Sequence, residues 1–224
     1  MPSRGGHGGS PLQIDMTFIK ICGITNLDDA LAAVAVGADA LGFNFYKPSP
    51  RYITPQRARE IVEQLPETVL TVGVFVNEES PDAVRSIANE AGVRALQLHG
   101  DETAEYCHEL AANYDVIKVF AVSDTFDFHA AQAYEVEAIM LDTRHNTLRG
   151  GTGRVFDWSV AQQAASRIPK LFLAGGLSPE NIKNAIEIVR PYAVDACSAL
   201  EDAQGKKNHA RMREFINTVR AVEP

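Results

Sequence analysis

The segment FIKICGITNLDDALAAVAVG (residues 18–37) contains one complete strand-and-helix unit. Its apolar start, Phe18–Ile21, is typical of a strand that is buried on both faces of a parallel sheet. The stretch Leu27–Val36 repeats apolar residues at helical spacing and carries two aspartates in its first turn, where they suit the helix dipole. Gly37 then ends the predicted helix.

The same unit recurs along the chain. Further strands are predicted at Ala40–Phe43, Val69–Phe75, Ala95–Leu98, Val116–Phe120, Ala138–Leu141, Leu171–Ala174 and Ala193–Val194. Further helices are predicted at Pro55–Leu65, Asp101–Ala112, Thr125–Tyr134, Ser159–Arg167 and Lys207–Val222, with two more beginning at Ser80-Pro81 and Ser178-Pro179. About eight such units predict an α/β fold, a single (β/α)8 TIM barrel. An open doubly wound sheet is the alternative, although the first turn, CGIT, lacks the Gly-x-Gly-x-x-Gly pattern of a dinucleotide site.

Composition narrows the class of protein. The 224 residues are 46% hydrophobic and 22% charged, which suits one globular domain over residues 17–224. Residues 1–16 are rich in Gly, Ser and Pro, and we expect a flexible leader there, either native or added for expression. The net charge of −8 argues against nucleic acid or an anionic membrane surface as a partner, and no stretch is apolar enough to cross a membrane. Three widely spaced cysteines favour free thiols in a reducing cytoplasm.

Candidate catalytic residues directly follow predicted strands, because the loops after the strands form the active face of a barrel. Cys22 lies just before a predicted helix start, which favours its thiolate form. Asp142 follows the apolar run AIML in the same way. A buried structural thiol and a carboxylate that bonds backbone amides are the alternatives.

Candidate binding residues occupy other loops of the same face. Arg51, in KPSPRYIT, suits a carboxylate ligand, with a solvated loop arginine as the alternative. Gln97 and His99 share one face of the fourth strand, and a structural histidine is the alternative there. Glycines in LAGGLSP and RGGTGR would let backbone amides approach an anion, and a tight turn without a ligand is the alternative. They are Gly175, Gly176, Gly150, Gly151 and Gly153.

Ordered motifs over residues 18–222 resemble the phosphoribosylanthranilate isomerase family. They are KICGIT, DALGFNFYKPSPRYI, VGVFVNE, LQLHG, LDT, GGTGRVFDW, GGLSPENI, RPYAVD and GKKNH. This resemblance implies an Amadori rearrangement of an anthranilate-bearing aminoribose 5-phosphate in tryptophan biosynthesis. It also implies that no metal and no cofactor is needed.

The resemblance implies a role for each candidate. Asp142 matches the general acid that opens the furanose, and Cys22 matches the general base that removes the C2′ proton. Arg51 matches the residue that holds the anthranilate carboxylate, while Gln97 and His99 match pocket residues. Phosphate binding is implied at Gly175, Gly176, Cys197 and Ser198.

One motif departs from the family pattern. The family usually has Ser-Ser-Gly after the eighth strand, whereas this chain has Cys197, Ser198 and Ala199. Ala199 lacks the freedom of glycine at positive φ, and both a weaker grip on phosphate and a broader specificity are open as consequences. A related sugar-phosphate isomerase, for instance one acting on the Amadori substrate of histidine biosynthesis, and a phosphate-binding protein without catalysis remain as alternatives. Monomer and homodimer both remain open.

Overall fold

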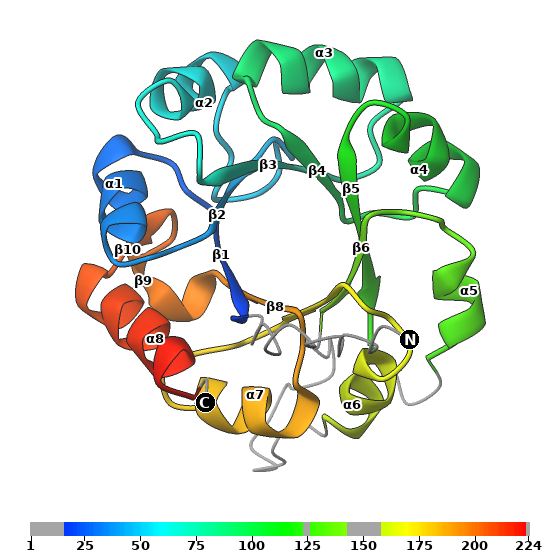
Figure 1. The fold of residues 1–224 in the computed structure, drawn as a ribbon. Coiled ribbons are helices and arrows are strands. Elements are labelled where there is room, and N and C mark those ends of the chain that lie inside the picture. The colour runs from blue at the N-terminus through cyan, green and yellow to red at the C-terminus, as the bar shows by residue number, and fades with distance from the viewer. Residues whose placement is uncertain (1–15, 123–125, 143–157, 223–224) are drawn as a thin grey trace, which may run out of the picture.

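Parallel strands close into a barrel in the computed structural model, which describes residues 16–122, 126–142 and 158–222 (Figure 1). Within these residues the barrel strands run in sequence order from β1 to β8. They are β1 Phe18–Cys22, β2 Ala40–Asn44, β3 Leu70–Phe75, β4 Ala95–Leu98, β5 Asp115–Ala121, β6 Ala138–Asp142, β7 Leu171–Ala174 and β8 Ala193–Ala196. The barrel closes where β1 pairs in parallel with β8, from Phe18 opposite Ala193 to Ile21 opposite Ala196. The predicted (β/α)8 fold is confirmed, and the open sheet is excluded.

Helices form a ring outside this barrel (Figure 1). They are α1 Leu27–Ala35, α2 Pro55–Val62, α3 Pro81–Ala91, α4 Ala104–Ala111, α5 Phe128–Gln132, α6 Ser159–Ala165, α7 Ile182–Val189 and α8 His209–Val222. A 3₁₀ helix, η1 Ser198–Leu200, and a short hairpin of β9 Glu201–Ala203 and β10 Lys206–Lys207 lie between β8 and α8. In the described part of the chain, every helix is too short or too polar to cross a bilayer.

Side-chain caps start several of these helices. Asn26, Thr54, Ser80 and Thr103 each accept a hydrogen bond from a backbone N–H in the first turn of the following helix. These bonds satisfy donors that have no partner within the helix. They place the starts of α1 to α4, and therefore the loops that precede them, at defined positions above the strands.

Some predicted helix starts are wrong. The helices predicted from Asp101 and Thr125 begin at Ala104 and Phe128, after the capping residues Thr103 and Asp127. The helix predicted to begin at Ser178-Pro179 begins at Ile182, because the Asn181 side chain accepts the Ser178 N–H and closes a turn instead. The helix predicted from Lys207 begins at His209, because Lys206 and Lys207 pair with β9.

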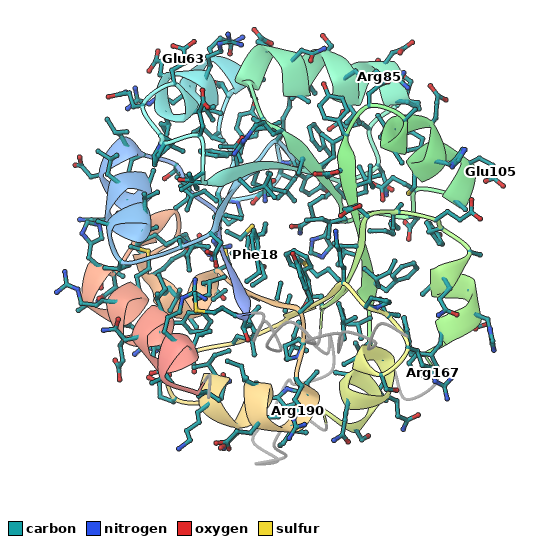
Figure 2. The ribbon with its side chains drawn as sticks, viewed as in Figure 1. Phe18, Glu63, Arg85, Glu105, Arg167 and Arg190 are labelled. Atoms are coloured by element: carbon teal, nitrogen blue, oxygen red, sulfur yellow. The ribbon has the colours of Figure 1, made fainter. Side chains whose placement is uncertain are left out.

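Two apolar layers stabilise the barrel. One lies inside it and includes Val72, Ile117, Met140 and Phe172, and the other lies between the strands and the helices. Figure 2 shows Glu63, Arg85 and Arg167 at the outer rim, whereas Phe18 lies within the ring of helices. The Phe18 ring stacks on Tyr192 and meets Phe172 edge-on where β1 and β7 begin. Apolar and aromatic side chains therefore fill the barrel below the strand ends.

We expect Phe215→Ala to lower the free energy of unfolding by about 3–5 kcal/mol, because the truncation leaves a cavity in a packed core. Phe215 is fully buried in α8, which packs against α1 and α7. Urea denaturation measures this change. The control is Ile188→Ala, which alters a side chain that is 44% exposed and should shift the free energy by less than about 0.5 kcal/mol. Equal effects of the two substitutions would contradict this account of the core.

Candidate active site

A cavity of about 380 Å³ opens at the carboxyl ends of the strands. The predicted site residues of the described chain all line it: Cys22, Arg51, Gln97, His99, Asp142, Gly175, Gly176, Cys197 and Ser198. The predicted glycine loop at residues 150, 151 and 153 lies outside the described residues. The fold therefore brings together nine side chains or backbones that the linear sequence separates by up to 176 positions, from Cys22 to Ser198.

Cys22 is the last residue of β1 and is 8% exposed at the base of the cavity. Its sulfur occupies space that no side chain at position 42 could share, because a Cβ on Gly42 would lie 2.8 Å from it. A hydrogen bond from Cys197 and the positive charge of Lys20 lower the pKa of Cys22 to about 6, although burial opposes the change. This lowering favours the thiolate form of Cys22.

Lys20 and Asp195 form a buried ion pair beneath Cys22. The Lys20 Nζ lies 2.7 Å from Asp195 Oδ1, and the two residues are paired in the register of β1 and β8. Burial alone lowers the pKa of Lys20, but the Asp195 carboxylate reverses this and raises the pKa above its ordinary value. Sequence reasoning overlooked Lys20, although a lysine inside the apolar run FIKIC signals a charge buried in a barrel strand.

Arg51 is held in place by a buried carboxylate. Its Nε and Nη2 donate to the two carboxylate oxygens of Glu201, at 2.7 and 2.6 Å. Lys207 Nζ lies 3.0 Å from Glu201 Oε1, and together these cations keep the pKa of Glu201 below its usual range despite burial. The solvated-arginine alternative is excluded, because Arg51 has an oriented guanidinium. Sequence reasoning also overlooked Glu201 and Lys207, which become neighbours of Arg51 only when β9 and β10 form.

Asp142, His99 and Gln97 form a chain of polar contacts along another wall of the cavity. Asp142 ends β6, and its Oδ2 lies 3.5 Å from His99 Nε2. The Nδ1 of His99 lies 3.3 Å from the Gln97 amide nitrogen. A neutral His99 that accepts from Gln97 at Nδ1 carries its proton on Nε2, facing Asp142. The amide oxygen of Gln97 is buried without a hydrogen-bond partner among the described residues, which suits an acceptor for a ligand donor.

The loops after β7 and β8 form a third wall. Gly175 and Gly176 both have positive φ, at 95° and 76°, and a Cβ on Gly176 would meet no atom within 4 Å. Cys197 and Ser198 open η1, and the first N–H groups of a helix have no partner within it. Ala199 lies inside η1, and the described non-glycine residues with positive φ are Asn77, Glu135 and Arg190. The backbone at Ala199 therefore does not need the conformational freedom of glycine.

Comparison with known proteins identifies close relatives. The family model for N-(5'phosphoribosyl)anthranilate (PRA) isomerase matches residues 19–218. The chain is 48% identical over 207 residues to the N-(5'-phosphoribosyl)anthranilate isomerase of Thermotoga neapolitana, covering 92% of this chain and all of the relative.

Solved structures of phosphoribosyl anthranilate isomerases also match this chain. The crystal structure of phosphoribosyl anthranilate isomerase from Thermotoga maritima matches with a TM-score of 0.85 at 46% identity, over 92% of this chain and all of that one. A second structure, in complex with reduced 1-(o-carboxyphenylamino)-1-deoxyribulose 5-phosphate, matches with a TM-score of 0.83 at 44% identity and the same coverage.

We expect one thiol to ionise with a midpoint near pH 6, because its neighbours Cys197 and Lys20 lower the pKa of Cys22. The ultraviolet absorbance of the thiolate, recorded as a function of pH without any ligand, measures this midpoint. Burial raises the pKa of Cys107 to about 11, so Cys107 stays silent in this range. The Cys22→Ala variant is the control and should lose the transition. A transition that survives in this variant would show that another thiol carries the charge.

Proposed function

The chain belongs to the N-(5'-phosphoribosyl)anthranilate isomerase family of tryptophan biosynthesis, and we propose that Asp142 and Cys22 are its general acid and general base. One observation carries this proposal: the two groups end strands β1 and β6 and line the same cavity. A side chain that is ionised at neutral pH and one able to donate a proton then face a single substrate.

In the first step Asp142 donates its proton to the ring oxygen of the aminoribose. The bond between this oxygen and C1′ breaks, and the lone pair of the anthranilate nitrogen forms a Schiff base with C1′. Protonation of the departing oxygen avoids an alkoxide, which is a poor leaving group. The contact with His99 Nε2 orients the Asp142 carboxyl toward the cavity.

In the second step the Cys22 thiolate removes the proton on C2′. The C–H electrons form the C1′–C2′ double bond and neutralise the iminium nitrogen. The resulting enolamine then tautomerises, with loss of the C2′ hydroxyl proton and gain of a proton at C1′, to give the 1-deoxyribulose product. No electron leaves the substrate, and the low pKa of Cys22 keeps the base in its working form near pH 7.

Two further contacts hold the ends of the substrate. The Arg51 guanidinium has five N–H donors, of which Glu201 takes two, and it lines the cavity that would hold the anthranilate carboxylate. Backbone groups of Gly175, Gly176, Cys197 and Ser198 suit the phosphate, since these residues lie at the loops after β7 and β8. The reacting carbons would then lie between Cys22 and Asp142.

We expect Cys22→Ser and Asp142→Asn each to lower kcat by a factor of about 10²–10⁴, with a much smaller change in KM, because each removes one proton-transfer group. Loss of fluorescence of freshly prepared phosphoribosylanthranilate measures turnover. Near-normal rates in both variants would refute the assigned roles.

The wild-type assay also separates the alternatives raised by the sequence. Binding of the substrate without conversion at any pH would favour a phosphate-binding protein. A parallel assay with the Amadori substrate of histidine biosynthesis tests broadened specificity.

We expect Arg51→Lys to raise KM by about 10–100-fold with a smaller effect on kcat, because lysine keeps the charge but loses the planar fork that matches a carboxylate. Steady-state kinetics under the same assay measure both constants. The control is Arg57→Lys, since Arg57 lies exposed on α2 and pairs with Glu60 away from the cavity. An unchanged KM in Arg51→Lys would show that Arg51 serves only to hold Glu201.

A further inference from the structure

We propose that Lys118 and Glu102 are positioning residues, whose buried ion pair fixes the backbone beside His99. The pair thereby holds the imidazole of His99 against Asp142, so this proposal rests on the proposed role of Asp142 as the general acid. The described lining of the cavity includes His99 but neither Lys118 nor Glu102. The pair therefore acts on the reaction through His99 and not by contact with the substrate.

The ion pair lies on the outer side of the barrel wall. Lys118 is in β5, and its neighbours Ile117 and Val119 face the barrel interior, so alternation along the strand turns Lys118 the other way. The Lys118 Nζ lies 2.6 Å from Glu102 Oε2, and the two side chains are 2% and 3% exposed. A buried ion pair can often be replaced by apolar side chains of similar volume without loss of stability. This pair is therefore better explained by the backbone conformation that it imposes than by stability.

Both members of the pair bind the backbone of Gly100, the residue that follows His99. Glu102 Oε2 accepts the Gly100 N–H at 2.9 Å, and Lys118 Nζ donates to the Gly100 carbonyl at 2.7 Å. Leu98 ends β4 and lies opposite Lys118 in the register of β4 and β5, so the loop leaves its strand directly beside the lysine. The peptide groups on both sides of Gly100 are thus fixed from outside the cavity.

The loop after β3 is joined to the same pair. Glu102 Oε1 accepts the backbone N–H of Asn77 at 2.8 Å. The Asn77 side chain in turn accepts the Asp101 N–H at 2.6 Å. A Cβ on Gly100 would clash with Asn77 Oδ1, so the two loops meet at a distance that only glycine allows. One carboxylate therefore ties the loops after β3 and β4 to the lysine of β5.

The position of His99 depends on this backbone because its side-chain contacts are long. Its Nε2 lies 3.5 Å from Asp142 Oδ2, and its Nδ1 lies 3.3 Å from the Gln97 amide nitrogen. The side chain is 34% exposed, so packing constrains it only in part. The His99 N–H donates to the Phe75 carbonyl at 2.9 Å, which holds one side of its backbone, and the ion pair holds the other. A small shift of the loop would separate the imidazole from Asp142.

The test replaces both charges together, by Lys118→Met with Glu102→Gln, so that neither charge stays buried alone. Turnover of phosphoribosylanthranilate is measured in this paired variant, in His99→Ala, and in the protein that carries all three substitutions. This double-mutant cycle shows whether the ion pair and His99 act through each other. Lys118→Arg keeps a charged donor and is the conservative variant.

We expect the paired variant to lower kcat by about tenfold with little change in KM, because the groups that bind the two ends of the substrate are intact. In the His99→Ala background the same replacement should lower kcat by less than about twofold, since the side chain that it positions is gone. Lys118→Arg should lose less activity than the paired variant. Phe215→Ala controls for lost stability alone, and its folded fraction should keep kcat within about twofold of the wild type.

A second variant perturbs the same loop from an exposed position. Asn77→Gly removes the acceptor of the Asp101 N–H, and glycine readily adopts the φ of 53° found at Asn77. We expect kcat to fall by about two- to fivefold, and again by less in the His99→Ala background. This variant decides the question if the paired variant does not fold.

Three outcomes would overturn the inference. They are an unchanged kcat in the folded paired variant (or in Asn77→Gly in its place), the same fractional loss with and without His99, and a rise in KM alone. The first shows that the acid does not need the pair, the second that the pair acts by another route, and the third that it shapes substrate binding. Failure of the proposed catalytic roles is a separate result, because it would appear as near-normal turnover in Asp142→Asn.

Discussion

The ion pair between Lys20 and Asp195 is the constraint on which the active end of the barrel depends. It lies where the first strand meets the last, and Lys20 has no exposure to water. A buried charge is stable only when an opposite charge lies beside it. Removal of one partner typically lowers the free energy of unfolding by about 3–5 kcal/mol, because the other charge remains buried alone. The register of β1 and β8 therefore depends on this ion pair as well as on backbone hydrogen bonds. Cys22 is the residue that comes directly after the paired stretch of β1.

Further ion pairs surround the cavity beside the Lys20–Asp195 pair. The cations Lys20, Lys207 and Arg51 face two carboxylates, Asp195 and Glu201. This cluster is neutral only when one further group is negative, and the Cys22 sulfur lies within it. A low pKa for Cys22 thus reflects the surrounding charges as well as its own hydrogen bond.

The sequence predicted the barrel closely, because buried parallel strands and capped amphipathic helices leave strong local patterns, as at Phe18–Cys22 and around Ser80-Pro81. It also placed Cys22 and Asp142 at strand ends and Arg51 in the loop after the second strand. It could not predict the pairing of Arg51 with Glu201 or of Lys20 with Asp195, since these residues are far apart in the chain and meet only in the folded barrel. The turn at Ser178–Asn181 was mistaken for a helix start because the same residue types favour both.

The pairing of β1 with β8 also affects when Cys22 acquires its lowered pKa during synthesis on the ribosome. Cys22 emerges early, but the neighbours that tune it, Asp195, Cys197 and Lys207, are among the last residues to be made. Pairing between segments so distant in sequence is a late and slow event in folding. A half-made chain therefore carries an ordinary thiol at position 22, and the lowered pKa of this thiol arises only after β8 and the residues that follow it have joined the barrel.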